Sequence, residues 1–224
     1  MPPATLTRGQ IVKAAVDLLD EAGLEGLNMR ALGKRLGTVP TAVYWHVKNK
    51  TDLITLAGDQ VWKEIALPDL TGTDWRRAAT AMATDFRAML IRHPWLIQVF
   101  GSYVVFGPNR ARHNDHSLAI FEAGGFTGAS VVQAATTVSI FVVGSALGPA
   151  GEAALRRSLR RLGGDADARI RDTIAKTREV AQQFRHLRAY LDARVATNAG
   201  LQETFEFGLR AVLDGLESQR RALR

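Results

Sequence analysis

Apolar residues recur at every third or fourth position along almost the whole of this sequence, and this spacing limits the fold more than any other feature. The pattern is clearest near the N-terminus, where it comprises Ile11, Ala14, Ala15, Leu18, Leu19 and Ala22. Residues at this spacing share one face of an α-helix, because the helix has about 3.6 residues per turn. We find no convincing run that alternates apolar with polar residues. The sequence therefore predicts an all-α protein.

Two short helices joined by a tight turn are predicted after the first helix. Asn28 can cap the earlier one and Gly37 ends it, while Thr38 can cap the later one. The later helix carries Pro40 in its first turn, where a missing N–H costs nothing, and it runs through His46. Helices joined this closely, with glycine at the turn, form a helix-turn-helix, whose second helix enters the major groove of DNA. We therefore predict a three-helix DNA-binding domain at the N-terminus.

The charge of the chain favours a polyanionic partner. The formal net charge is +7, and the first 50 residues contain seven Lys or Arg against four Asp or Glu. No acidic residue lies between Glu25 and Asp52. A basic surface of this kind suits nucleic acid or an anionic membrane.

The first residues of the second short helix are the candidates for contacts with the bases. Their small size lets the helix approach the floor of the groove. Thr41 can hydrogen-bond to a base, and Pro40 or Ala42 can contact a thymine methyl group. Arg30, on the preceding helix, can bind a guanine through two hydrogen bonds. We count Thr38, at the turn, with this DNA-binding set.

The residues after this base-facing group are candidates for contacts with the DNA backbone. Val43 and Val47 are spaced to face the core, so at least one neighbouring aromatic ring is expected to be exposed. The expected sugar and phosphate contacts are Tyr44, Trp45, His46, Lys48 and Lys50. Lys50 also lies at the start of the next helix, where the dipole favours an anion. The alternative is an ordinary three-helix packing unit with a solvated basic face.

Several runs in the first 65 residues match one known family in order and spacing. They are Ile11-Val12-Lys13-Ala14-Ala15, Leu18-Leu19-Asp20-Glu21-Ala22-Gly23, Asn28-Met29-Arg30-Ala31-Leu32, Leu36-Gly37 and, most specific of all, Tyr44-Trp45-His46-Val47-Lys48-Asn49-Lys50. Residues 5–65 resemble the DNA-binding domain of the tetracycline-repressor (TetR) family of bacterial transcription regulators, in the branch nearest the tetracycline repressor itself. The remainder resembles the family only in its helical layout.

The resemblance implies a homodimer with a two-helix-hairpin interface, a double-stranded DNA operator, and a ligand pocket in each C-terminal domain. By motif position it puts the residues named above at the bases or near the backbone. The closest relatives have longer polar side chains where this sequence has Pro40 and Ala42. The operator sequence is therefore not carried over.

A segment at residues 68–73 containing proline and glycine predicts a linker. We therefore expect a DNA-binding domain at residues 1–67 and a larger helical domain for effector binding and dimerisation at residues 68–224. The other helices are expected at residues 51–66, 74–92, 109–123, 129–148, 185–197 and 201–221. Residues 156–178 are polar and Arg-rich, and form either a mobile connection or a helix with a solvated face.

Residues 123–151 carry no charged side chain over 29 positions. About 20 apolar residues are enough to cross a membrane. This stretch also contains Gln133, Thr136 and several glycines, so a helix buried on most sides within the protein explains it better. We expect no membrane partner.

The last helix carries two stripes along its length. The apolar stripe consists of Leu201, Phe205, Leu209, Val212 and Leu216. The second stripe consists of the small residues Thr204, Gly208, Ala211 and Gly215. A helix with two packing faces suits a partner on each, so this helix and the uncharged 129–148 helix predict a homodimer interface. The alternative is a monomeric core with tight internal packing.

Aromatic and polar side chains across the middle helices predict an effector pocket, because pockets are mostly apolar with a few placed polar groups. The candidates are Trp62, Phe86, Met89, His93, Phe100, Tyr103, Phe106, His116, Phe121 and Phe141. For any one of these residues, core packing is the commoner role. His113 and His116 make a metal site conceivable, but no third ligand has a recognisable spacing. A solvated helix turn is the commoner arrangement, and we expect no metal or other cofactor.

Several classes of function are excluded or disfavoured. The absence of cysteine removes disulfides, cysteine-ligated metals and thiol catalysis, and fits a cytoplasmic protein. We find no phosphate-binding loop, nucleophile elbow or paired carboxylates, and no secretory signal at residues 1–5. The sequence predicts a ligand-responsive repressor in which the 51–66 helix, with Trp62, connects pocket to DNA-binding helices. The alternatives are a helical DNA-binding factor without effector, or an α-helical carrier or enzyme.

Overall fold

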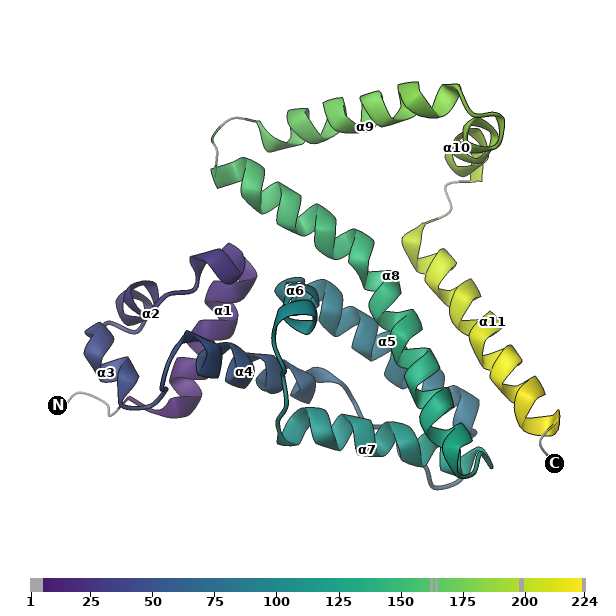
Figure 1. Cartoon of the computed structure of the whole chain (residues 1–224), viewed down its shortest axis with the longest axis horizontal. Coiled ribbons are helices and arrows are strands. Elements are labelled where there is room, and N and C mark those ends of the chain that lie inside the picture. The colour runs from purple at the N-terminus through teal and green to yellow at the C-terminus, as the bar shows by residue number, and fades with distance from the viewer. Residues whose placement is uncertain (1–5, 162, 164, 198–199, 223–224) are drawn as a thin grey trace.

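The computed structural model describes residues 6–161, 163, 165–197 and 200–222, and this part is helical without any strand. The all-α prediction is therefore confirmed, whereas the expectations for residues 1–5 and for the side chain of Leu201 lie outside the described part. The elements are α1 (Arg8–Gly26), α2 (Met29–Arg35), α3 (Pro40–Tyr44), α4 (Lys50–Val61), the 3-10 turn η1 (Trp62–Glu64), α5 (Trp75–Arg92), α6 (Trp95–Ser102), α7 (Pro108–Ala123), α8 (Ala129–Arg161), α9 (Ala166–Gln182), α10 (Arg185–Thr197) and α11 (Leu201–Ala222). Helices α1–α4 form one end of the molecule, and α5–α8 with α11 form the other (Figure 1).

α1 begins with a capping box, in which two side chains satisfy the first free N–H groups of the helix. The Thr7 hydroxyl accepts a hydrogen bond from the Gln10 backbone N–H at 3.3 Å, and the Gln10 side chain accepts one from the Thr7 N–H at 2.9 Å. Gly23 lies within α1. It adopts a φ of 68°, which kinks α1, and the helix resumes to Gly26.

The helix-turn-helix differs in detail from the expectation. α2 is capped by Asn28, as predicted, through a 2.9 Å bond from the Ala31 N–H. Thr38 does not cap α3, because Pro40 occupies its first position and Val39 therefore becomes the cap residue, without a side-chain hydrogen bond. α3 is also shorter than expected and ends at Tyr44, two residues before His46.

The connection from the DNA-binding end to the rest of the molecule passes through α4. This helix packs against α1 on one side and against α6 and α7 on the other. It ends at Val61 rather than continuing to residue 66, and η1 follows directly. One apolar core runs through both ends of the molecule, and α4 contributes Leu53, Ile54, Ala57 and Val61 to it.

α8 corrects two expectations. It extends from Ala129 to Arg161, far beyond the expected 129–148, and its most apolar 18-residue window is only 33% buried. Among the described residues it is the one helix long and apolar enough to cross a membrane by length and composition. Burial on most sides is therefore wrong for the single chain. Within the 156–178 segment, residues 156–161 end α8 and residues 166–178 belong to α9, which Asp165 caps through a 2.9 Å bond from the Ala168 N–H, so these two parts are helical.

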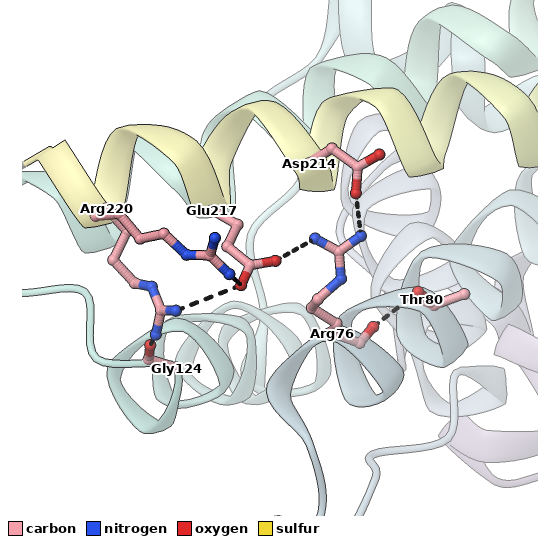
Figure 2. A network of polar contacts seen from close by, with 7 residues as sticks. Arg76, Thr80, Gly124, Asp214, Glu217 and Arg220 are labelled. Carbon is pink, nitrogen blue, oxygen red and sulfur yellow. Dashed lines mark hydrogen bonds and ion pairs between the residues drawn. The ribbon is translucent and has the colours of Figure 1, made fainter.

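α11 is fastened to the core by an arginine–carboxylate network (Figure 2). Arg76 on α5 donates to Glu217 at 2.8 Å and pairs with Asp214, both on α11. Arg220 donates to the Gly124 carbonyl and lies 3.7 Å from Glu217. Beneath these pairs the apolar face of α11 packs on α8, with Phe205, Leu209 and Leu213 buried.

Candidate DNA-binding surface and effector cavity

The surface expected to contact DNA depends on a close approach between α2 and the turn before α3. A Cβ atom on Gly33 would lie 2.9 Å from the Thr38 carbonyl oxygen and 3.3 Å from the Pro40 nitrogen. Only glycine fits this position without a shift of the backbone. Val43 and Val47 are buried and fix α3 to the core. The opposite face of α3 is therefore left to solvent.

None of the predicted DNA contacts is fully buried. Tyr44 is 53% exposed and Trp45 is 88% exposed, so both rings, and not only one, lie outside the core. Of the other candidates, Arg30, Pro40, Thr41, Lys48 and Lys50 are exposed, and Thr38, Ala42 and His46 are half-buried. All ten fall between α2 and the start of α4. Their contacts with DNA stay a prediction.

Side-chain hydrogen bonds that the sequence analysis did not predict hold the start of α4. Asn49 caps the helix by accepting the Asp52 N–H at 2.8 Å, and the Asp52 carboxylate accepts the Lys48 N–H at 3.0 Å. The Lys50 ammonium donates to the Leu24 carbonyl at 2.7 Å, which ties α4 to the end of α1. An ammonium has three N–H donors, so Lys50 keeps two for a phosphate.

A buried polar cluster joins the DNA-binding end to the rest of the molecule. The two ring nitrogens of His93 lie 2.7 Å from Asp20 of α1 and 3.0 Å from Glu64 of η1. Trp95 donates its indole N–H to the same Asp20 oxygen at 2.7 Å, and Arg92 pairs with Glu64. Burial lowers the pKa of His93, but the hydrogen bonds and charges of Asp20 and Glu64 outweigh burial and raise it overall. His93 is thus a link between α1 and η1 and does not line the effector cavity.

A cavity of about 470 Å³ lies between η1, α5, α6, α7 and α8. Three of the predicted effector residues, Trp62, Phe86 and Phe100, form its aromatic wall. The ring centroids of Trp62 and Phe86 are 4.9 Å apart, and those of Trp62 and Phe100 are 6.3 Å apart. The opposite wall is the aliphatic face of α8, formed by Ile140, Val143, Gly144 and Leu147. A smaller hollow of about 20 Å³ beside it is lined by Phe86 and by Phe121.

The other predicted effector residues lie elsewhere. Met89 is a core residue, and Phe141 stacks on Phe205 of α11 with their ring planes 19° apart. Phe106 is 72% exposed, and Tyr103 is half-buried just after α6, outside the cavity wall. His116 faces the linker, with Nε2 2.8 Å from the Pro68 carbonyl oxygen. Aromatic composition alone did not separate core, surface and cavity positions.

Three cavity residues on α7 are absent from the predicted effector set, namely Arg110, His113 and Asn114. The Arg110 guanidinium lies 5.5 Å from the Trp62 ring centroid and 5.3 Å from that of Phe100. His113 is 5% exposed, and burial lowers its pKa to about 4. The expectation of a solvated turn is therefore wrong for His113. The signal was present in the sequence, since Arg110, His113 and Ser117 share the α7 face that also carries Ile120.

Polar atoms on this cavity wall lack hydrogen-bond partners. The indole N–H of Trp62 and the Nε2 atom of His113 are both buried without a partner in the described structure. A buried polar group without a partner costs free energy, so such atoms call for a ligand or water to satisfy them. No group of three or more metal-ligating side chains was found in the described part of the chain.

Comparison with known proteins places this arrangement in a family. Residues 11–56 match the model of the bacterial regulatory proteins of the tetR family, and residues 67–220 match the tetracyclin repressor-like C-terminal domain. The chain belongs to the tetR family. It is therefore a ligand-responsive transcriptional regulator, as the sequence predicted, and its α2–α3 unit is the helix-turn-helix of that family.

Three relatives illustrate how far the similarity of this tetR-family regulator extends. It is 39% identical to an HTH-type transcriptional regulator of Saccharopolyspora erythraea over 140 residues, which are 62% of this chain and 59% of that protein. It is 33% identical to the HTH-type transcriptional repressor DrrR1 of Streptomyces coeruleorubidus over 98% of this chain and 82% of the repressor. The crystal structure of ActR from Streptomyces coelicolor in complex with actinorhodin matches with a TM-score of 0.73 and 27% identity, over 96% of each chain.

Proposed function

We propose that two copies of this protein bind a palindromic operator and that a small, largely hydrophobic molecule in the cavity releases them, which makes the protein a repressor. One observation carries the proposal. Trp62 forms part of the cavity wall and belongs to η1, the direct continuation of α4, while α4 packs against α1. A ligand that moves Trp62 therefore moves the base of the DNA-binding unit.

In the proposed release mechanism, the ligand changes the separation between the two recognition helices of the dimer. Helix-turn-helix dimers place their recognition helices about 34–36 Å apart, one turn of duplex. The His93 cluster ties α1 to η1, so the tilt of α4 and η1 is passed on to α1. A ligand shifts this equilibrium only by binding one conformation more tightly than the other.

The exposed faces of α8 and α11 support a homodimer. Ile140 is 67% exposed and Leu147 is 55% exposed on α8, and Phe207 on α11 is 69% exposed. Gly208 of the small-residue stripe already packs on Phe141 within the chain, whereas Ala211 and Gly215 face solvent. The exposed apolar residues on the uncharged part of α8, together with Phe207 of α11, suit contact with a second copy. Ile140 and Leu147 also line the cavity, so the proposed interface borders the effector.

DNA binding is tested with two substitutions. Lys50→Ala is expected to weaken binding to all duplexes similarly and to flatten the dependence of affinity on salt by about one charge. Arg30→Ala is expected to cost about 1–3 kcal/mol and to relax preference at one operator position. Fluorescence anisotropy on duplexes selected from a random pool by the wild-type protein measures both. Equal, sequence-independent losses for the two variants contradict these roles.

Effector response is tested on the dimeric protein bound to its selected duplex. A library of small aromatic molecules is screened for dissociation of the complex, and sedimentation confirms the dimer before and after release. Release by a molecule that binds the cavity supports the repressor. A DNA-binding factor without effector gives no release by any compound, and a carrier or enzyme gives weak DNA binding that salt does not affect. The proposal assigns the cavity to binding rather than catalysis and places the protein in the cytoplasm.

A further inference from the structure

The charged residue in the cavity lining limits the chemical class of effector that the cavity can bind. Arg110 is the one charged side chain among the residues that line the cavity at neutral pH, since the lowered pKa of His113 keeps that ring neutral. Burial also lowers the pKa of Arg110, which reflects the cost of holding its charge partly out of water. A charged group in this position is stable when an opposite charge meets it.

The protein itself leaves most of the Arg110 guanidinium unused. One N–H group donates to the Val105 carbonyl at 2.5 Å. No ion pair joins Arg110 to an acidic side chain in the described ranges, whereas Arg76 pairs with both Asp214 and Glu217. A guanidinium carries five N–H donors, in a planar arrangement that matches the two oxygens of a carboxylate.

The backbone of Arg110 is held in place independently of its side chain. The buried Asp59 carboxylate accepts the backbone N–H groups of Asn109 at 3.1 Å and of Arg110 at 3.0 Å, and the Asn109 side-chain amide at 2.6 Å. Asp59 therefore closes the start of α7 and connects it to α4. The guanidinium is presented from a fixed helix end, over the rings of Trp62 and Phe100.

Two further polar atoms without a partner belong to residues that line the same cavity. The unpartnered Trp62 indole N–H is a donor. His113 Nδ1 lies 3.4 Å from the Asn114 side-chain oxygen. In the tautomer that donates this weak contact, the unpartnered Nε2 accepts a hydrogen bond from a ligand hydroxyl.

We propose that the effector is a planar aromatic acid that carries a hydroxyl group, with its carboxylate on Arg110 and its rings among Trp62, Phe86 and Phe100. The inference deepens the proposed function, because it names the class of molecule that the effector cavity takes. A volume of about 470 Å³ suits a small multi-ring molecule. The aliphatic face of α8 covers the side of the rings opposite Trp62.

The test compares the affinity of the protein for an aromatic acid with its affinity for the uncharged amide of the same shape. The probes are 3-hydroxy-2-naphthoic acid and 3-hydroxy-2-naphthamide, which share shape and hydroxyl and differ in charge. Dissociation constants are measured by isothermal titration calorimetry on the full-length dimer. We expect the acid to bind roughly tenfold to hundredfold more tightly than the amide, the range for a charge-assisted hydrogen bond.

Variants locate the origin of that preference. Arg110→Gln is expected to remove the preference for the acid while leaving amide affinity within about threefold, and Arg110→Lys to restore part of it. Arg77→Gln, an exposed arginine on α5 outside the cavity wall, is the matched control and is expected to change neither affinity. Thermal unfolding and DNA binding of each variant verify that it is folded.

Each outcome bears on the inference separately from the proposed function. Equal affinity for acid and amide, equal losses for both in Arg110→Gln, or no binding of the acid at millimolar concentration overturns the aromatic acid as effector class. If the acid binds through Arg110 but does not release DNA, this assignment of the cavity stands and the repressor mechanism fails. If another, uncharged compound releases DNA, the mechanism stands and this assignment fails.

Discussion

The molecule buries two histidines in two regions, and their surroundings are opposite. His93, at the joint between α1 and η1, has a carboxylate within 3.0 Å of each ring nitrogen and a raised pKa. His113, in the cavity wall, has a pKa lowered to about 4 by burial and an Nε2 atom without a partner. A satisfied polar cluster holds two elements together, whereas an unsatisfied polar atom beside a cavity leaves a hydrogen bond for a ligand or water to complete. The same residue type is therefore fully hydrogen-bonded in one place and, beside the cavity, left with an unpartnered nitrogen in the other.

The largest effect on the free energy of unfolding is expected from removing His93, the histidine with a carboxylate at each ring nitrogen. His93→Ala leaves the carboxylates of Asp20 and Glu64 facing each other without a cation between them. We expect a loss of about 3 kcal/mol in the free energy of unfolding, the lower end of the range for a broken buried pair, because both carboxylates are about a third exposed. Urea unfolding measures it, with the exposed His186→Ala as control. A loss no larger than that of the control shows that the joint does not depend on His93.

Acidification is expected to change the contributions of His93 and His113 to the free energy of unfolding in opposite directions. Between pH 6.5, the ordinary value, and about 4, the unfolded chain binds a proton at residue 113 that the folded chain refuses. The His113 contribution to stability is therefore lost as the pH falls through this window, by about 2–3 kcal/mol. His93 has the opposite sign. Its contribution is fully present below pH 6.5 and is lost as the pH rises through its raised folded pKa. Urea unfolding from pH 8 to pH 4.5 measures both limbs.

Replacing the unsatisfied histidine is expected to stabilise the protein. His113→Leu keeps a similar volume and removes the unpartnered nitrogen, so we expect a gain of about 1 kcal/mol at pH 7. The same variant is expected to lose the part of the acid sensitivity that His113 supplies. Destabilisation at pH 7 would indicate that Nε2 has a partner and that the two histidines are not opposites.

The smallest effect is expected from weakening one side of the joint. Glu64→Gln removes one of the two charges beside His93, and we expect a loss of less than about 1 kcal/mol because Glu64 is partly exposed. The pKa of His93, followed by NMR, should fall, and it should fall further in Asp20→Asn, since Asp20 supplies the larger of the two favourable contributions. The pKa of His113 should be unchanged in both variants. A parallel shift there would mean that the two regions are electrically coupled.

Local chemistry explains which parts of the fold could be predicted. The capping box of Thr7 and Gln10 and the Asn28 cap depend on residues three positions apart, so the sequence contains all that is needed. Some of the incorrect predictions concern neighbouring residues, and others concern residues far apart in the sequence. Thr38 was assigned as a cap although Pro40 already fixed the start of α3 one residue later.

In the candidate site, residue type alone did not distinguish cavity positions from core and surface positions. The rings of Trp62, Phe86 and Phe100 were chosen for their type, and so were Met89 and Phe106, which the fold puts in the core and at the surface. Separating these groups requires knowing which faces of η1, α5, α6 and α7 meet. The predicted effector set lacks Arg110 and His113 because a polar residue on a helix face is usually solvated, although both share a face with Ile120, and the packing of α7 against η1 and α8 places them in the cavity wall.

The sequence by itself determined that the chain is helical, the caps at Thr7 and Asn28, and the family motif, because hydrogen bonds between residues three or four apart set the caps and helices. The tertiary structure alone decided which histidine meets two carboxylates and which meets none. It also decided that the apolar face of α8 stays open and that a guanidinium lies over two rings. These features depend on desolvation, and the loss of water at a side chain depends on elements that lie far apart along the chain.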